Sequence, residues 1–228
     1  MATQEKILIS WSGGKDSCLM LHEALKSGKY EVAALVCMVK EEEQRISMHG
    51  VPVQLLDRQA ESLGLRLEKI FTTQVLNYEA VMERVVSKFS GKGIQKFAYG
   101  DLFLQDIRDY RIKLHARIGM ECLFPIWKRD TTAFAQDFIS AGYRAIVSCV
   151  DAKKLDISFA GRLYDSSFLK DLPPGVDPCG ENGEFHTFVF DGPLFKHAIG
   201  FSPAPPVLTR FEEPGHDFQL GFCDLVPA

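Results

Sequence analysis

One short stretch near the N-terminus restricts the fold more than any other part of the chain. An apolar, β-type run over residues 6–11 ends in Ser-Gly-Gly-Lys-Asp-Ser at residues 12–17, and a helical pattern over residues 17–27 follows at once. Glycines in such a turn can adopt positive φ and let backbone N–H groups approach an anion, towards which the helix directs its positive end. The stretch predicts a strand, a phosphate-binding loop and a helix in succession. The alternative is a plain, well-capped connection, and the Walker spacing GxxxxGK[ST] is absent from the sequence.

The rest of the first half repeats this alternation of apolar runs and amphipathic patterns. Strands are expected at residues 6–11, 32–39, 66–72, 96–101 and 120–127, and helices at residues 17–27, 51–63, 77–89 and 105–118. Such alternation is typical of an α/β fold with right-handed crossovers. We therefore expect a five-stranded parallel nucleotide-binding sheet with helices on both faces, within a domain of residues 1–128. Ligands of such sheets bind beyond the carboxyl ends of the strands.

The chain changes character near residue 120, after which 13 of the 17 phenylalanines and 10 of the 11 prolines occur. A helix is expected at residues 131–141 and strands at residues 143–150, 186–191 and 218–225. Between them, residues 159–183 are rich in Gly, Pro and Asp, and we expect a helical stretch there at most. Long irregular segments in compact proteins are usually functional. These patterns predict a smaller α+β domain over residues 129–228.

The bulk composition limits the classes of function. With 46% hydrophobic residues the chain can bury a substantial core, and its longest apolar run, residues 32–39, is too short to span a bilayer. A basic and then hydrophobic leader is absent from the N-terminus, so we expect a cytoplasmic protein without a membrane partner. The net charge of -4 disfavours a nucleic-acid partner. Six cysteines without a CxxC pair indicate free thiols.

A second motif, DPCGENGEFHT, occupies residues 177–187 of the irregular segment. It places two glycines, the carboxylates of Glu181 and Glu184, and His186 within seven residues, directly before an expected strand. This density of titratable groups on a constrained loop favours a functional site. The alternative is a solvated turn whose charges face water.

The two motifs together resemble the diphthine–ammonia ligase family, also called the ATP-binding domain 4 family. SGGKDS at residues 12–17 looks like the PP-loop of the N-type ATP pyrophosphatases, which split ATP between the α and β phosphates. The likeness spans nearly the whole chain through YGDL (99–102), PIW (125–127), CGENGEFHTF (179–188) and DGPLF (191–195). It implies an N-terminal domain of the adenine nucleotide alpha hydrolase type, a C-terminal substrate domain, and an active site in the cleft between them.

The same resemblance implies an enzyme that uses ATP and Mg²⁺. Family members adenylate the carboxylate of diphthine, a modified histidine on translation elongation factor 2, with release of pyrophosphate. Ammonia then displaces AMP and leaves an amide. A carboxylate needs such activation because its own oxygen is a poor leaving group.

Roles for the residues of the first motif follow from the resemblance. Lys15 would neutralise the charge that develops on the leaving pyrophosphate, and Asp16 would cap the helix or help to hold Mg²⁺. The pyrophosphate itself would be held by amides and hydroxyls of Ser12, Gly13, Gly14 and Ser17.

Further candidates lie at the expected strand ends. Asp101, after Gly100, is placed to meet Mg²⁺ or a ribose hydroxyl, with a helix N-cap as the alternative. Arg108 and Arg111 lie one turn apart on the next expected helix, and both are candidates to face the cleft. Arg108 is a candidate phosphate or substrate ligand, or else a solvated partner of nearby acids. His49 follows the second strand and either lies near the adenine or the substrate or has no task there.

The second motif offers Glu181 and Glu184 as bases for ammonia or as Mg²⁺ ligands, and His186 as a proton shuttle or a structural histidine. Members known for diphthamide synthesis tend to read EGGEYET where this chain reads ENGEFHT, so Asn182, Phe185 and His186 are departures. The acceptor pocket is therefore expected to differ, although a carboxylate-bearing substrate and ammonia remain the implied partners.

Two other functions stay open at this point. Sulfur-transferring relatives with PP-loops use paired cysteines on tRNA, for which Cys122 and Cys179 are the candidates, but the acidic balance disfavours this. A sensor that binds an adenine nucleotide without turnover would have no need of the carboxylate-rich second motif. A homodimer is also left open.

Overall fold

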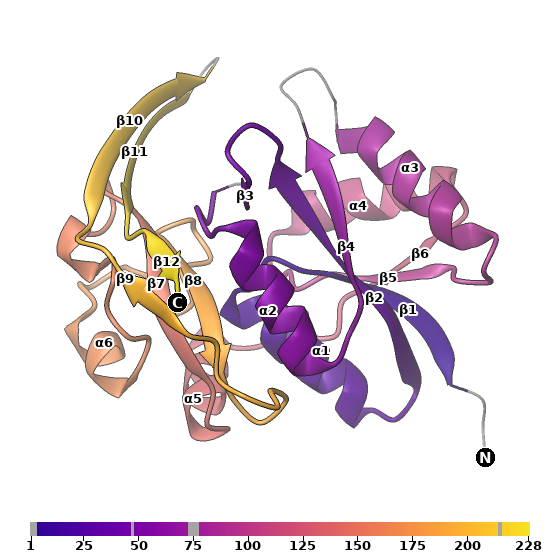
Figure 1. The fold of residues 1–228 in the computed structure, drawn as a ribbon, viewed down its shortest axis with the longest axis horizontal. Helices are drawn as coiled ribbons and strands as arrows, with labels where there is room; N and C mark the ends of the chain where they lie inside the picture. The colour runs from indigo at the N-terminus through magenta and orange to yellow at the C-terminus, as the bar shows by residue number, and fades with distance from the viewer. Residues whose placement is uncertain (1–3, 47, 73–77, 214–215) are drawn as a thin grey trace.

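The computed structural model describes residues 4–46, 48–72, 78–213 and 216–228 (Figure 1). Its first half, residues 4–123, contains a six-stranded sheet in which five strands run parallel in the order β4-β2-β1-β5-β6, with β1 at the centre. A two-residue strand pairs antiparallel with the end of β2. The strands are β1 (Glu5–Ser10), β2 (Tyr30–Lys40), β3 (Arg45–Ile46), β4 (Leu67–Thr72), β5 (Lys96–Ala98) and β6 (Glu121–Leu123). The expected five-stranded parallel sheet is confirmed.

Alternate residues of β1 explain why helices cover both faces of this sheet. Ile7 and Ile9 pack into the core shared with α1 (Lys15–Lys26) and α2 (Val53–Leu63), whereas Leu8 packs with α3 (Tyr78–Ser90) and α4 (Gln105–Arg117) on the other face. A strand buried on both faces has a continuous apolar sequence, as observed here. Figure 1 shows the two helix pairs on opposite sides of the sheet. The expected helix at residues 77–89 is α3, and residue 77 lies outside the described residues.

The strand predicted at residues 120–127 is only partly correct. β6 ends at Leu123, and Trp127 N donates to Phe124 O in a turn that follows. Pro125 has no N–H to extend the ladder, so the apolar run continues as a turn and not as a strand.

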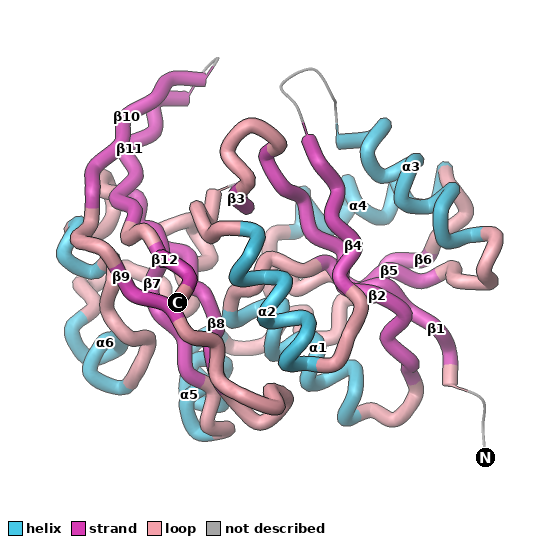
Figure 2. The backbone as a smooth tube through the Cα atoms, in the orientation of Figure 1, coloured by secondary structure: helices cyan, strands magenta, loops and turns pink. Residues whose placement is uncertain are grey.

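The second half, residues 131–228, contains a four-stranded antiparallel sheet in the order β10-β11-β7-β8 and a separate pair of short strands. The tube in Figure 2 shows the β10–β11 hairpin rising from this sheet. The single strand predicted at residues 218–225 is only partly correct: residues 218–222 belong to β11, but the chain leaves β11 at Phe222, Cys223 N bonds to Ser148 O, and Leu225 joins another sheet. The elements of the second half are α5 (Thr131–Ser140), β7 (Arg144–Asp151), η1 (Ile157–Phe159), α6 (Ser166–Asp171), β8 (Phe185–Asp191), β9 (Phe201–Pro203), β10 (Val207–Glu213), β11 (His216–Phe222) and β12 (Leu225–Pro227).

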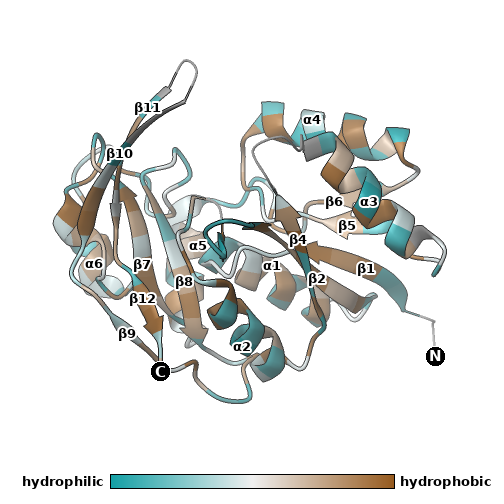
Figure 3. Cartoon of the chain, turned by 45° about the horizontal axis from the view of Figure 1, so that its top comes forward, coloured by the Kyte–Doolittle hydropathy of each residue, from teal (hydrophilic) through white to brown (hydrophobic). Residues whose placement is uncertain are grey.

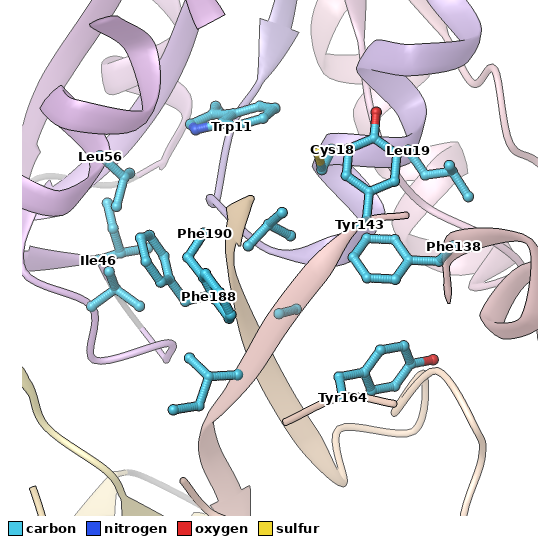
Figure 4. Close-up of a cluster of buried hydrophobic side chains, with 14 of the residues drawn as sticks. Trp11, Cys18, Leu19, Ile46, Leu56, Phe138, Tyr143, Tyr164, Phe188 and Phe190 are labelled. Carbon is cyan, nitrogen blue, oxygen red and sulfur yellow. The ribbon is translucent and has the colours of Figure 1, made fainter. Parts of the chain in front are cut away.

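One hydrophobic core runs through both halves. Trp11, directly after β1, and Leu56 of α2 belong to the same buried cluster as Phe188 and Phe190 of β8 (Figure 4). Figure 3 shows hydrophobic colour along the central strands, whereas the helices carry both colours. Burial of this kind fixes β8 against the loop that follows β1, and there the candidate site lies. Among the described residues, no helix is both long and apolar enough to span a membrane.

Candidate active site between the two halves

The phosphate loop, residues 12–17, turns the chain from β1 into α1. Gly13 has φ +77°, in the left-handed region that suits glycine, and Gly14 is the N-cap of α1. The Ser17 hydroxyl donates to Gly14 O at 2.9 Å and lies 3.4 Å from the Ser12 hydroxyl. Both hydroxyls line a cavity at the start of α1. A helix N-terminus beside paired hydroxyls suits an anion.

Lys15 is the cation of this loop, and only 2% of it is exposed. Its Nζ lies 2.8 Å from Asp16 Oδ1 and 5.7 Å from the centre of the Phe185 ring. Burial by itself lowers the pKa of Lys15, but nearby negative groups, among them Asp16 and Glu181, outweigh burial and hold the pKa above its ordinary value. Lys15 therefore stays charged inside the site.

Residues outside the phosphate loop hold it in place, and the sequence interpretation gave them no role. Lys15 N donates to Thr187 Oγ1 of β8 at 3.0 Å, and Val189 N, also of β8, donates to Gly13 O at 2.9 Å. From α2, Gln59 Nε2 donates to Gly13 O at 3.0 Å. A signal for Gln59 was present, because a polar residue three positions after Leu56 falls on the apolar face of α2. The second half of the chain thus supplies part of the loop's support.

Two cavities meet beside the phosphate loop. The main cavity, of about 580 Å³, lies between the loop and the second motif, and the apolar cavity, of about 290 Å³, lies over β2 and β5. The apolar cavity has a wall of hydrophobic side chains, namely Val36, Met38, Ile46, Met82 and Phe97. Both cavities share Ser10, Ser12, His49, Tyr99 and Arg111 as lining residues. A ligand with an apolar ring system and an anionic tail fits this arrangement.

The main cavity brings together most of the site residues proposed from the sequence. It is lined by Ser12, Asp16, Ser17, His49, Gly100, Asp101, Glu181 and His186. Gly100 has a steric reason to be glycine, because a Cβ there would lie 3.2 Å from the Asp16 carbonyl carbon. The close approach of Gly100 to the loop places Asp101 at the cavity wall.

Arg111, not Arg108, is the arginine of α4 among the described residues that line the cavities. Arg111 Nε donates to Asp101 Oδ2 at 2.8 Å, Nη2 donates to Oδ1 at 3.3 Å, and the guanidinium lies 4.1 Å from the centre of the Tyr99 ring. Such a bidentate pair fixes both groups, so Asp101 is held by Arg111. The two arginines are three residues apart, and the sequence alone did not decide which one faces inward.

Arg108 stacks elsewhere on α4. Its guanidinium carbon lies 5.1 Å from the centre of the Phe124 ring and 4.9 Å from that of Trp127. Its Nε is buried without a hydrogen-bond partner among the described residues. The structure therefore gives Arg108 aromatic neighbours and leaves its proposed ligand role untested.

The acceptor loop, residues 177–184, contains the two glutamates of the second motif and places them in different environments. Glu184 is buried, and its carboxylate accepts from Asp177 N (3.1 Å), Asn182 N (2.9 Å) and Asn182 Nδ2 (3.1 Å). Glu181 lines the main cavity, and burial together with the charge of Asp16 raises its pKa to about 8. Glu184 shapes the loop, and Glu181 is the carboxyl group suited to proton transfer near neutral pH.

His49 and His186 form a ring pair at the junction of the two halves. Their ring centres are 4.4 Å apart with an angle of 31° between the planes. Burial lowers the pKa of His49 to about 4 and that of His186 well below its ordinary value. Both imidazoles are therefore neutral at pH 7, so the ordinary histidine pKa no longer supports a shuttle role for His186. His49 Nδ1 is buried without a partner among the described residues.

Asp16 and Asp101 are the carboxylates proposed to hold Mg²⁺, and both line the main cavity. Each is already paired with a cation, Lys15 or Arg111. Within the described ranges, three or more His, Cys, Asp or Glu side chains nowhere gather in a metal-binding arrangement. One or two carboxylates together with phosphate oxygens are usual for Mg²⁺, so this set fits an ion that arrives with a nucleotide.

The cysteines give no support to sulfur transfer. Cys122 packs beside the α3–α4 face of the sheet, whereas Cys179 belongs to the core shared by the two halves. Burial raises the pKa of each thiol to about 12. A thiol of this pKa is a poor nucleophile at neutral pH.

Known proteins share both halves of this architecture. The profile of the diphthamide synthase N-terminal domain matches residues 5–122, and that of the diphthamide synthase C-terminal domain matches residues 130–223. The diphthine–ammonia ligase of Danio rerio is 28% identical over 215 residues, which cover 82% of this chain and 83% of that protein. The diphthine–ammonia ligase of Homo sapiens is 27% identical, over 82% of this chain and 79% of its own.

The fission-yeast and archaeal matches are more partial. The diphthine–ammonia ligase of Schizosaccharomyces pombe is 28% identical over 85% of this chain and 36% of its own. Among solved structures, a predicted subunit of tRNA methyltransferase from Methanocaldococcus jannaschii has a TM-score of 0.41 and 18% identity, covering 64% of this chain and 80% of that chain. Because the two diphthamide synthase profiles together account for most of the sequence, the chain belongs to the diphthamide synthase family.

Proposed function

We propose that this protein is an ATP-dependent ligase that adenylates a carboxylate and passes the acyl group to ammonia. The observation that carries the proposal is the convergence of the phosphate loop and the acceptor loop on one cavity of about 580 Å³. The diphthine–ammonia ligases among its relatives make a diphthine-type carboxylate the first acceptor to consider. In this proposal residues 1–128 bind ATP and residues 129–228 bind the acceptor.

The shapes of the two cavities support one direction for the nucleotide. Hydrophobic side chains such as Val36 and Met38 give the apolar cavity the character of a nucleobase pocket. The triphosphate would then enter the main cavity, where Ser12 and Ser17 present hydroxyls at the start of α1. The residues common to both cavities, Arg111 among them, would lie near the α-phosphate.

Adenylation requires charge stabilisation at the phosphates. An acceptor carboxylate oxygen attacks the α-phosphorus, the bond to the β-phosphate bridge breaks, and the electron pair leaves on pyrophosphate. Lys15 keeps its positive charge in the buried site and would balance the charge that develops on the leaving group. Mg²⁺, held by Asp16, Asp101 and phosphate oxygens, would supply Lewis-acid stabilisation of the same charge.

Amide formation requires a proton acceptor. The ammonia lone pair attacks the acyl carbon, the C–O bond to AMP breaks, and one N–H proton must leave nitrogen. Glu181 is the group we assign to this proton, because its pKa of about 8 lets the ionised form coexist with the protonated form near neutral pH. We assign Glu184 a loop-forming role in place of this one, because its carboxylate already accepts three bonds from Asp177 and Asn182.

The test is acceptor-dependent formation of AMP and pyrophosphate. The full chain is incubated with ATP, Mg²⁺, ammonium and a diphthine-bearing protein, and then with a metabolite library in its place. We expect AMP, pyrophosphate and amide in equal amounts. ADP as the product would contradict the reaction class, and nucleotide binding without turnover for every acceptor would identify a sensor.

A further inference from the structure

Gln59 is a buried carboxamide at the meeting point of three elements. It lies in α2 with 0% exposure, on the buried face that also carries Leu55 and Leu56. Its Oε1 accepts from Trp11 Nε1 at 3.0 Å, and its Nε2 donates to Gly13 O at 3.0 Å and to Val189 O. Figure 4 shows the indole nitrogen of Trp11 on the side of Leu56 and hence of α2.

The partners of Gln59 belong to the two parts of the proposed active site. Gly13 is in the phosphate loop, and Val189 is in β8, two residues after Thr187 and three after His186. Val189 N donates to Gly13 O at 2.9 Å, and Thr187 Oγ1 accepts from Lys15 N at 3.0 Å. β8, which continues directly from the acceptor loop, is thereby bonded to the phosphate loop at Gly13 and at Lys15.

Only a side chain with both donor and acceptor atoms satisfies this position. A methionine would fill the space but leave the Trp11 N–H and the Val189 carbonyl unpaired in the core. An ionised glutamate has no donor, so its carboxylate would face the carbonyl oxygens of Gly13 and Val189 without a hydrogen bond. The contact is also close, because a Cβ on Gly13 would lie 2.8 Å from Gln59 Oε1.

We propose that Gln59 is a positioning residue that sets the shape of the phosphate loop and ties it to β8 through Gly13 and Val189. The proposal rests on the proposed function only in taking the loop to bind nucleotide. Its consequence is that displacement of β8 by an acceptor changes the geometry offered to the triphosphate, and the coupling works in both directions.

The test compares Gln59→Met with Gln54→Met in the full chain. Gln54 lies on the same helix and is exposed, so it is a matched control. The first readout is amide hydrogen exchange of peptides covering residues 11–18 and 185–191, without nucleotide. We expect at least tenfold faster exchange in both peptides for Gln59→Met and no change for Gln54→Met, with cooperative thermal unfolding retained.

The second readout is the affinity for the Mg²⁺ complex of α,β-methylene-ATP, which cannot be cleaved at the α–β bridge. We expect about tenfold weaker binding for Gln59→Met. Gln59→Glu should bind better at pH 6 than at pH 8, because a protonated carboxyl regains a donor. This pH dependence would not follow from a purely structural role.

Two outcomes overturn the inference: unchanged exchange in both peptides, or an equal loss of protection throughout the protein, which would make Gln59 an ordinary core residue. A parent protein that binds no nucleotide would sink the proposed function instead. In that case the exchange data, which need no ligand, still decide the role of Gln59.

Discussion

The phosphate loop and the acceptor loop reach the same cavity, but the side chain that organises each one has a different origin. Gln59 of α2, 46 residues from Gly13, bonds to Gly13 O together with Val189 N of β8. In the acceptor loop the organising side chain is its own Glu184, which accepts from Asp177 N and Asn182 N, while Tyr164 and Lys154 add bonds from outside to Pro178 O and Asn182 O. The difference teaches that the central contact of one loop depends on a distant helix, whereas that of the other is encoded within the loop.

The largest expected effect comes from removing the positive charge of Lys15 from the phosphate loop. Lys15→Met should lower the rate of pyrophosphate release on the order of 10²- to 10³-fold, because a buried positive charge aimed at developing negative charge is lost. Lys26→Met, on the exposed end of the same helix, is the control. Steady-state rates with matched circular dichroism spectra decide, and equal rates in both variants would remove Lys15 from the mechanism.

A second substitution breaks the local order of the acceptor loop. Glu184→Ala should reduce the free energy of unfolding by about 2 kcal/mol, because amides that bonded to the carboxylate lose their acceptor. Urea denaturation measures the change, with the exposed Glu42→Ala as control. If the two variants are equally stable, the loop does not depend on Glu184.

A third experiment sharpens the contrast between the two glutamates. At a fixed concentration of free ammonia, Glu181, with a pKa of about 8, should give a rise of about tenfold in the amidation rate between pH 7 and pH 9, as its ionised fraction increases. The rise should vanish in Glu181→Gln and persist in Glu121→Gln, an exposed control. A parent rate that is flat over this range would exclude Glu181 as the base.

The raised pKa of Glu181 also predicts how the stability of the fold changes with pH. Between pH 4.5 and about 8 the folded protein holds the Glu181 proton more tightly than the unfolded chain does. Its contribution to stability therefore decreases as pH rises through this window. Thermal melts of Glu181→Gln should lack that part of the slope.

A smaller effect separates the two arginines of α4. Arg111→Lys should weaken binding of α,β-methylene-ATP about tenfold, because lysine cannot keep the bidentate bond to Asp101 or the stack on Tyr99. Arg108→Lys should change affinity less than twofold. Isothermal titration of both variants measures this, and a reversed order would return the ligand role to Arg108.

The smallest expected effect concerns the thiols. Replacement of Cys122 and Cys179 by serine together should leave AMP formation within about twofold of the parent, since both thiols are protonated at neutral pH. Loss of activity at unchanged thermal stability would revive sulfur transfer.

The comparison of the loops also shows what sequence could and could not predict. The parallel sheet followed from periodicity, and the phosphate loop from glycines between a strand and a helix, because both signals are local. Gln59 and Thr187 were assigned no role since their partners lie 46 and 172 residues away. The choice between Arg108 and Arg111 depended on helix rotation, and the reduced pKa of His186 depended on burial by other elements.

The core common to both halves has a consequence for how this protein can be divided. Phe188 and Phe190 pack in one cluster with Trp11 and Leu56. A cut between residues 123 and 131 would therefore expose apolar surface on each fragment. Separately expressed fragments should aggregate, and co-expressed fragments should rejoin by complementation. Gene fusions and domain exchange within this family would then succeed only when the two halves that form this common core come from the same protein.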